Sequence, residues 1–201
     1  MDLINKGAEA NLYRDGDRLL KERVSKKYRI PFLDNRLRKA RTKHEAKILE
    51  KLKDVGFPSP RLLEVRLDEK KLWMEYLEGD TLKKIFRELE LEGCKKLGDE
   101  IGRMIALLHT NRIVHNDLTT SNLLLCDGRI YLIDFGLAFH THRVEDQAMD
   151  LVVFRKSLYA SHPSKADKIW EAIIKSYKEN FKESKEIMKR TEQIEKRVRY
   201  A

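Results

Sequence analysis

Short apolar runs separated by turn residues mark the first part of the chain. Apolar residues occur at 3–4 and around 11–13, and a third stretch, at 18–24, mixes apolar with charged residues. The last two runs flank Asp15-Gly16-Asp17, and an Asp-Gly step between short apolar runs is a strong hairpin signal. We therefore predict β-strands at these three places, with a tight turn between the second and the third.

A helical period follows, from about Asp34 to Val55. Gly56 and Pro58 end this pattern, because neither residue continues a helix well. The period advances in steps of three and four through Leu37, Arg41, Glu45, Ile48 and Leu52. Two further strands are predicted beyond this helix, at 61–65 and 72–76.

The second part of the chain is mostly helical in period. Helices are predicted over 81–89 and 94–109, and a strand pair is predicted around Asp127-Gly128. Ser164 and Asp167 stand at capping-box spacing, which predicts the start of a later helix. The pattern indicates an α+β protein with a β-rich lobe at 1–78, carrying one main helix, and a mostly helical lobe at 79–201.

Charge is concentrated in one segment. The chain has 201 residues, 41% of them hydrophobic, which is enough for a packed core, and its formal net charge is +9. The segment from Lys21 to Lys53 contains thirteen basic and four acidic residues. Its excess of nine positive charges equals the net charge of the whole chain. A solvated helix face and a surface for an anionic partner, nucleic acid or an acidic protein, both remain open.

Cysteine usage and hydropathy limit the protein class. No apolar run is long enough to span a bilayer, and the first residues lack the layout of a signal peptide. Cys94 and Cys126 have no partner at metal-ligand spacing. We therefore expect a reduced, cytoplasmic protein without a membrane segment.

One loop carries a candidate base and a candidate metal ligand. His115-Asn116-Asp117 is followed by Asn122, and the Asp-to-Asn spacing of five matches the catalytic loop of protein kinases. Asp134-Phe135-Gly136 follows an apolar run at 130–133, where a carboxylate at a strand end is well placed to hold a metal. We assign Asp117 as the general base and Asn122 and Asp134 as Mg²⁺ ligands for ATP-dependent phosphoryl transfer.

Lys21 is the candidate cation for the phosphates. It lies on the strand after the Asp-Gly turn, and Glu45 on the following helix is its expected partner. The segment that would cover the phosphates is Lys6, Gly7, Ala8, Glu9 and Ala10, which has one glycine where kinases usually have three. This loop should be stiffer than usual, and Glu9 would add a negative charge beside the phosphates.

Two further assignments remain open between alternatives. Glu75 and Leu77 would offer backbone groups to adenine with Met74 behind them, although Met74 is nearly as well explained as core. Asp150 is either the cap of a helix or a brace for the backbone of the catalytic loop.

Only thirteen residues separate Gly136 from Asp150, and no Ala-Pro-Glu occurs in the chain. There is no room for the activation loop and peptide shelf of ordinary protein kinases, so the expected fold is a minimal bilobal kinase-like fold that lacks an activation segment. The chain resembles the small kinase of the KEOPS (EKC) complex, the PRPK family. The residues that carry this resemblance are Gly7-Ala8-Glu9-Ala10, Lys21 with Arg23, Tyr28-Arg29, Asp117 to Asn122, Ile133 to Leu137 and Ser161-His162-Pro163.

The resemblance implies an ATPase and atypical Ser/Thr kinase that works with the threonylcarbamoyl-transferase subunit and other KEOPS subunits. It implies a role in forming N6-threonylcarbamoyladenosine in tRNA, and it offers tRNA as the anionic partner of 21–53. Asn116 stands where the family usually has glycine, and the basic tail is reduced to Lys196-Arg197-Val198-Arg199.

Two other functions remain as alternatives. Sugar or antibiotic kinases also lack Ala-Pro-Glu, but they usually carry a substrate pocket in additional C-terminal helices. Here the C-terminus is short, highly charged and without an evident pocket. A pseudokinase adaptor, which binds a partner without chemistry, would fit the single glycine of the phosphate loop but not the retained Lys21, Asp117 and Asp134.

Overall fold

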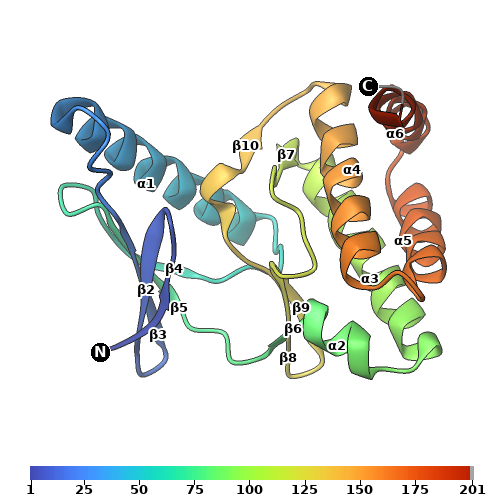
Figure 1. Cartoon of the computed structure of the whole chain (residues 1–201), viewed down its shortest axis with the longest axis horizontal. Coiled ribbons are helices and arrows are strands. Elements are labelled where there is room, and N and C mark those ends of the chain that lie inside the picture. The colour runs from blue at the N-terminus through green and yellow to red at the C-terminus, as the bar shows by residue number, and fades with distance from the viewer. Residues whose placement is uncertain (200–201) are drawn as a thin grey trace. The chain divides into compact units, whose positions relative to one another are not determined.

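A computed structural model describes residues 1–199 (Figure 1). The last two residues of the predicted 79–201 lobe, and the side chains at positions 198 and 199 of its basic tail, lie outside that description. The chain forms two compact units: Met1–Glu78 with Asp134–Gly136, and Gly79–Ile133 with the residues from Leu137 onward. Their roles as a nucleotide-binding lobe and a catalytic lobe stay a prediction.

The first unit contains a five-stranded antiparallel sheet in the order β1-β2-β3-β5-β4. The predicted hairpin is confirmed, since Asp15 pairs with Arg18 across a turn in which Gly16 has a φ of 62°. A positive φ favours glycine, which explains the Asp-Gly signal. The strands are β1 (Asp2–Lys6), β2 (Ala10–Asp15), β3 (Arg18–Arg23), β4 (Leu62–Arg66) and β5 (Lys71–Glu75).

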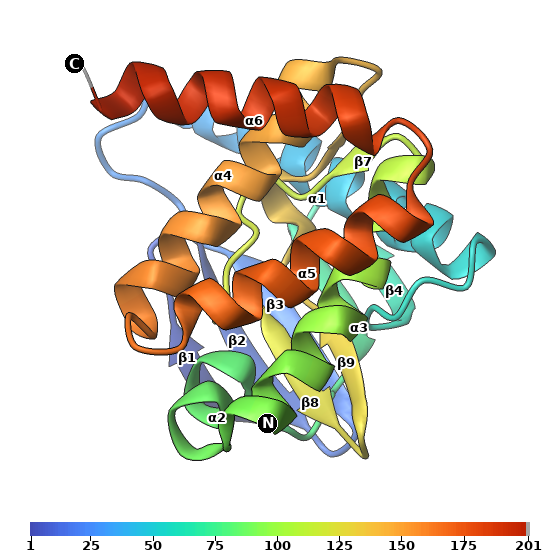
Figure 2. The same cartoon turned by 90° about the vertical axis from the view of Figure 1, so that its right-hand side faces the viewer.

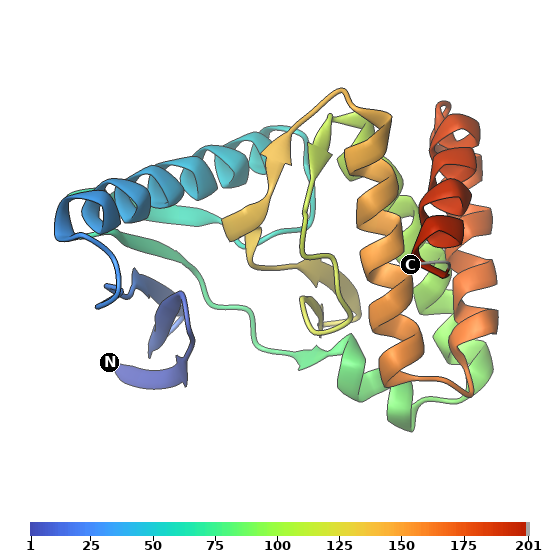
Figure 3. The same ribbon diagram turned by 45° about the horizontal axis from the view of Figure 1, so that its top comes forward.

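The long helix α1 (Pro31–Asp54) packs on β4 and β5 and lies along the sheet (Figure 3). It begins three residues before the expected Asp34, because Pro31 at the first turn suits the fixed φ of proline. It ends at Asp54, one residue before the expected Val55, and the predicted stop residue Gly56 follows with a φ of 68°. The amide of Phe57 donates to the carbonyl of Leu52 at 2.9 Å, which completes a Schellman cap.

The second unit is built on helices, with α3 packed on α5 and α4 on α6 (Figure 2). A Cβ on Gly102 of α3 would lie 2.3 Å from the carbonyl oxygen of Ile173 on α5, so glycine permits the close approach of the two helices. The helices are α2 (Leu82–Glu88), α3 (Leu91–Thr110), α4 (Val144–Ser161), α5 (Ala166–Asn180) and α6 (Ser184–Arg199). Along residues 1–199, no helix combines the length and the apolar character needed to cross a membrane.

Short strands position the loops of the second unit. The predicted pair around Asp127-Gly128 is confirmed as β8 (Leu123–Cys126) and β9 (Arg129–Leu132), with β6 (Asp80–Thr81) beside β8. A separate pair joins β7 (Ile113–Val114) to β10 (Phe139–His140). The loop that carries Asp117 therefore begins at one strand pair and ends at the other.

The capping box predicted at Ser164 is wrong. Helix α5 begins at Ala166, and its cap residue Lys165 makes no side-chain capping bond. The carbonyl of His162 accepts the amides of Lys165 and Ala166, and the side chain of Asp167 accepts the hydroxyl of Tyr159. The local pattern was overridden because the turn after α4 already satisfies the first amides of α5.

Candidate active site

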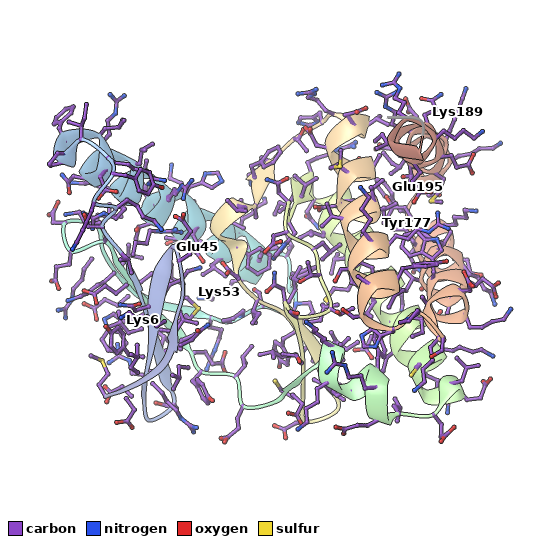
Figure 4. The ribbon with its side chains drawn as sticks, in the orientation of Figure 1. Lys6, Glu45, Lys53, Tyr177, Lys189 and Glu195 are labelled. Atoms are coloured by element: carbon purple, nitrogen blue, oxygen red, sulfur yellow. The ribbon has the colours of Figure 1, made fainter. Side chains whose placement is uncertain are left out.

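The predicted pair of Lys21 and Glu45 is formed in the first unit. Nζ of Lys21, on β3, lies 2.6 Å from Oε1 of Glu45, on α1, and both side chains are buried. Figure 4 labels Glu45 at α1. The pair joins the sheet to the helix. A buried lysine held this way can present its ammonium at a fixed place.

The structure adds two interactions that the sequence analysis missed. Arg23, two residues after Lys21 on β3, binds the other oxygen of Glu45 at 2.5 Å. Lys21 Nζ also lies 2.7 Å from Oδ1 of Asp134. The Asp-Phe-Gly carboxylate is therefore joined to the predicted phosphate cation, and Arg23 is a further buried cation in the same cluster.

Lys21 stays protonated in this cluster. Burial alone would lower the pKa of Lys21, but the charges of Glu45 and Asp134 and the hydrogen bonds that Lys21 donates to both outweigh it and raise the pKa above its ordinary value. Lys21 is therefore a permanent cation at physiological pH, as a phosphate ligand requires.

The single-glycine loop connects β1 to β2. The amide of Gly7 donates to the carbonyl of Ala10 at 3.0 Å, and a Cβ on Gly7 would lie 2.8 Å from that oxygen, so this tight turn requires glycine. Glu9 is bound by Arg41 at 2.7 Å, and Lys26 lies 3.7 Å from its carboxylate. The negative charge expected beside the phosphates is thus already partnered by two cations.

The connector residues lie at the end of β5 and beyond it. Met74 is buried between Leu19 and Leu62 of the neighbouring strands, which fits the core alternative. The amide of Glu75 donates to Arg61, whereas the backbone groups of Leu77 have no backbone partner among the residues described. A donor for adenine would therefore come from Leu77, and the role of all three connector residues stays a prediction.

Asp150 is the brace and not the cap. It is the seventh residue of α4, well inside the helix. Its Oδ2 accepts the amide of His115 at 2.6 Å, and its Oδ1 accepts the amide of Asn116 at 2.7 Å. Asp150 is itself buried, so these bonds fix the backbone immediately before Asp117.

Asp117 and Asn122 lie together in the same loop. Nδ2 of Asn122 donates to the carbonyl of Asp117 at 2.8 Å and to its carboxylate at 3.1 Å. The side-chain oxygen of Asn122 takes no part in these bonds. The amide of Ile133 donates to the carbonyl of Asn122 at 2.9 Å, and Asp134 is the next residue in the chain.

A buried histidine–tyrosine pair connects Asp150 to α5. Nδ1 of His109 lies 2.9 Å from the hydroxyl of Tyr177, and Nε2 of His109 lies 3.5 Å from Oδ2 of Asp150. His109 and Tyr177 are both fully buried. The sequence analysis missed this pair, although a histidine on the apolar side of a predicted helix was the available signal.

The donor set suits magnesium. Among the residues described, no group of three or more His, Cys, Asp and Glu side chains could hold a metal by themselves. Magnesium, however, commonly takes one or two protein oxygens and completes its shell with phosphates and water. Asp134 has a half-exposed carboxylate and Asn122 an amide oxygen, which are ligands of that kind.

Comparison with known proteins identifies close relatives. Residues 6–161 match the protein kinase domain family, which confirms the expected α+β kinase-like fold. The chain is 39% identical over 212 residues to the KEOPS complex subunit Bud32 of Pyrococcus abyssi, covering 100% of this chain and 96% of that protein.

Longer relatives contain the chain as one part. A probable bifunctional tRNA threonylcarbamoyladenosine biosynthesis protein of Methanocaldococcus jannaschii is 41% identical over 202 residues, covering 98% of this chain and 37% of that protein. The protein of the same description from Methanosarcina acetivorans is 37% identical, and the chain covers 35% of it. The chain therefore spans little more than a third of the length of these bifunctional relatives.

Proposed function

Because this chain belongs to the protein kinase family, and within it to the family of the KEOPS subunit Bud32, we propose that it is an ATPase and atypical Ser/Thr kinase of a KEOPS-type complex. The observation that carries the proposal is the buried Lys21, bound at once by Glu45 and Asp134. A lysine joined to a helix glutamate, with an Asp-Phe-Gly carboxylate beside it, is the phosphate-binding arrangement of kinases.

Each residue of the site has one proposed role in the reaction. Lys21 neutralises phosphate charge, and Asp134 and Asn122 are proposed as the magnesium ligands. Magnesium, when bound with ATP, offsets the charge that develops on the phosphates. Asp117 accepts the proton of the attacking hydroxyl or water, and Asp150 holds the backbone that carries it.

The segment after Asp-Phe-Gly supports a kinase without a peptide shelf. Between Leu137 and Met149 the chain forms the short strand β10, a connecting segment at 141–143 and the first turns of α4. The hydroxyl of Thr141 donates to Asp146 at 2.7 Å and accepts the amide of Arg143, so these two bonds hold the connecting segment. No length is left over for a mobile activation loop, which favours ATP hydrolysis and self-phosphorylation over phosphorylation of a peptide.

The names of the relatives support a role in forming threonylcarbamoyladenosine in tRNA. We propose that this chain works in the cytoplasm with a threonylcarbamoyl-transferase subunit and other KEOPS subunits. In several relatives, the region similar to this chain is one part of a longer, bifunctional protein. We therefore expect this chain to act together with a protein that carries a second activity.

The basic segment 21–53 is proposed as a binding surface for tRNA. Seven of its thirteen cations are bound to carboxylates of the first unit: Lys21, Arg23, Lys26, Arg29, Arg38, Lys39 and Arg41. Lys43, Lys47 and Lys51 are exposed, recur every four residues on α1, and have no carboxylate partner among residues 1–199. One turn of rise separates each from the next, so they form a stripe that can follow a phosphate backbone.

The proposal is tested by magnesium-dependent release of phosphate from ATP, measured with the partner subunits present. We expect Asp117→Ala and Asp134→Ala each to lower turnover by roughly 10²- to 10⁴-fold. Asp99→Ala removes a partly exposed carboxylate that binds Arg103 on α3, and it should leave turnover unchanged. Normal turnover by both site variants would refute the mechanism.

Two other outcomes would favour the alternatives. Tight nucleotide binding with no turnover in the assembled complex would favour a pseudokinase adaptor. Rapid phosphorylation of a metabolite by the isolated chain would favour a small-molecule kinase. The single glycine of the phosphate loop fits the adaptor, and the small-molecule kinase has no specific observation in its favour. The binding of Lys21 to both Glu45 and Asp134 supports the catalytic kinase over the adaptor.

A further inference from the structure

The carboxylate of Glu45 is shared between two cations of the same strand. Lys21 binds Oε1 at 2.6 Å and Arg23 binds Oε2 at 2.5 Å. Residues two apart on a strand point to the same face, which is why both side chains reach one carboxylate. The side chains of Arg23 and Glu45 are only 5% and 2% exposed, so neither charge is solvated by bulk water.

We infer that Arg23 is a positioning residue of the phosphotransfer site: by binding the second oxygen of Glu45, it holds Lys21 in its phosphate-binding place and keeps the site net positive. The inference rests on the proposed ATP chemistry but names a residue beyond the Lys–Glu pair and the Asp-Phe-Gly carboxylate. Its two consequences concern charge and geometry.

The charge consequence follows from counting the charged groups of the cluster. Lys21 and Arg23 balance Glu45 and Asp134. When Asp134 serves as a metal ligand, the two cations are left with one carboxylate, and the cluster presents one net positive charge to the phosphates. Without Arg23, Lys21 and Glu45 would neutralise each other, and the phosphates would meet a neutral pair.

The geometric consequence is that α1 is attached at two places. Arg23 on β3 binds Glu45. Asp34, buried near the start of α1, accepts Ser25 Oγ, in the segment that follows β3, at 3.0 Å and Arg38 Nε of its own helix at 2.7 Å. Arg38 also donates to the carbonyl of Arg23 at 3.3 Å, so the two attachments are linked.

Ordinary protein kinases use a different element to control the position of this helix. In protein kinases the position of the helix that carries the glutamate depends on the activation loop and its phosphorylation. Here the cations that bind the buried carboxylates of α1 are Arg23, on β3, and Arg38, on α1 itself. The Lys–Glu pair is therefore assembled without phosphorylation.

Arg23 also borders the Asp-Phe-Gly turn. A Cβ on Gly136 would lie 3.3 Å from Nη2 of Arg23, 3.5 Å from Nζ of Lys21 and 3.2 Å from Oδ1 of Asp134. The guanidinium therefore faces the same small space as the ammonium and the carboxylate. This places Arg23 beside the reacting region, where its guanidinium binds Glu45.

The test compares Arg23→Met, Arg23→Lys and Arg18→Met in the assembled complex. Arg18 is on the same strand, partly exposed, and bound to Glu64, so it is the matched control. The readouts are MgATP affinity by calorimetry, KM and kcat for ATP, and thermal unfolding. We expect Arg23→Met to weaken MgATP binding and raise KM about 10- to 100-fold, because a charged hydrogen bond in a buried site is removed.

Arg23→Lys keeps the charge and should recover most of that loss, while Arg18→Met should bind MgATP normally. If Arg23 acts through Glu45, the effect of Arg23→Met should nearly vanish in a Glu45→Gln background, which a double-mutant cycle measures. This double variant also keeps the test valid if Arg23→Met alone fails to fold, since it leaves no buried unpaired carboxylate.

Unchanged affinity and KM in Arg23→Met, or a lowered unfolding temperature with normal affinity, would overturn the inference. An equal loss in Arg23→Lys and Arg23→Met would overturn it too. The proposed function fails separately: a wild-type protein that binds MgATP without turnover refutes phosphotransfer, while the affinity series still tests Arg23.

Discussion

The hydroxyl of Tyr177 lies 2.9 Å from Nδ1 of His109, joining α5 to the end of α3 inside the second unit. His109 in turn faces Asp150, the residue that binds the backbone before Asp117. A side chain on α5 is therefore linked through two buried groups to the catalytic loop. Burial and the neighbouring charge of Asp150 raise the pKa of Tyr177, so its hydroxyl stays protonated and can donate to His109.

Replacing Tyr177 by Phe should destabilise the protein by about 1–3 kcal/mol, because His109 would lose the partner of a buried nitrogen. Thermal or urea unfolding measures this loss. We also expect a lower kcat with little change in KM for ATP, since the change acts on the catalytic loop. The control is Tyr159→Phe, which removes a hydroxyl bound to Asp167 near the surface. Equal stability in Tyr177→Phe and wild type would show that the link carries no energy.

Asn116 has a φ of 61°, in the left-handed region that glycine and asparagine tolerate best. This explains why asparagine can stand at a position where related kinases are expected to have glycine. Asn116→Gly should retain stability and turnover. Asn116→Val should cost about 1–2 kcal/mol in unfolding free energy and lower turnover, because a branched side chain resists this conformation. Chemical unfolding compares the two, and similar stability in both would contradict the backbone explanation.

Asp34 should make the stability of the protein depend on pH in the acid range. Burial alone would raise the pKa of Asp34, but hydrogen bonds from Arg38, Ser25 and the amide of Lys26 lower it below its usual 3.8. A lowered folded-state pKa stabilises the fold above pH 3.8, and the contribution is lost as the pH falls below that value.

Asp34→Asn should therefore be less stable than wild type at pH 7, and the difference should shrink below pH 3.8. Urea unfolding at pH 7 and near pH 3 gives the comparison. Asp54→Asn, at the exposed end of the same helix, is the control and should behave like wild type at both pH values. A difference that stays constant with pH would exclude ionised Asp34 as the cause.

The lysine stripe on α1 should contribute to tRNA affinity by neutralising phosphates. Changing Lys43, Lys47 and Lys51 to Gln should weaken tRNA binding by the assembled complex. It should also reduce the slope of log K against log salt by about 0.7–0.9 for each phosphate that is no longer neutralised. Binding is measured across a salt series.

The control for the stripe removes three exposed lysines of the second unit, Lys175, Lys178 and Lys182, in the same way. Equal reductions of affinity and slope in both triple variants would indicate a general effect of net charge, and the tRNA-binding role assigned to α1 would be wrong.

The sequence alone determined the local elements and the spacing of the chemical groups. Asp15-Gly16 predicted a hairpin that the pairing of Asp15 with Arg18 confirms, because the turn depends on residues adjacent in the chain. The proximity of Asp117 and Asn122 was also accessible, since the two lie five positions apart in one loop. The Lys21–Glu45 pair could be foreseen because a strand followed by a helix is a common kinase pattern.

Only the tertiary structure decided which distant residues share a partner. The family resemblance named Arg23 beside Lys21, but nothing in the sequence showed that both bind Glu45. Asp150 could be a cap or a brace until α4 was found to begin at Val144. The energy of a buried charge depends on the groups that surround it, and those groups come from remote parts of the chain. The sequence identified the chemistry, and the packing assigned its supporting residues.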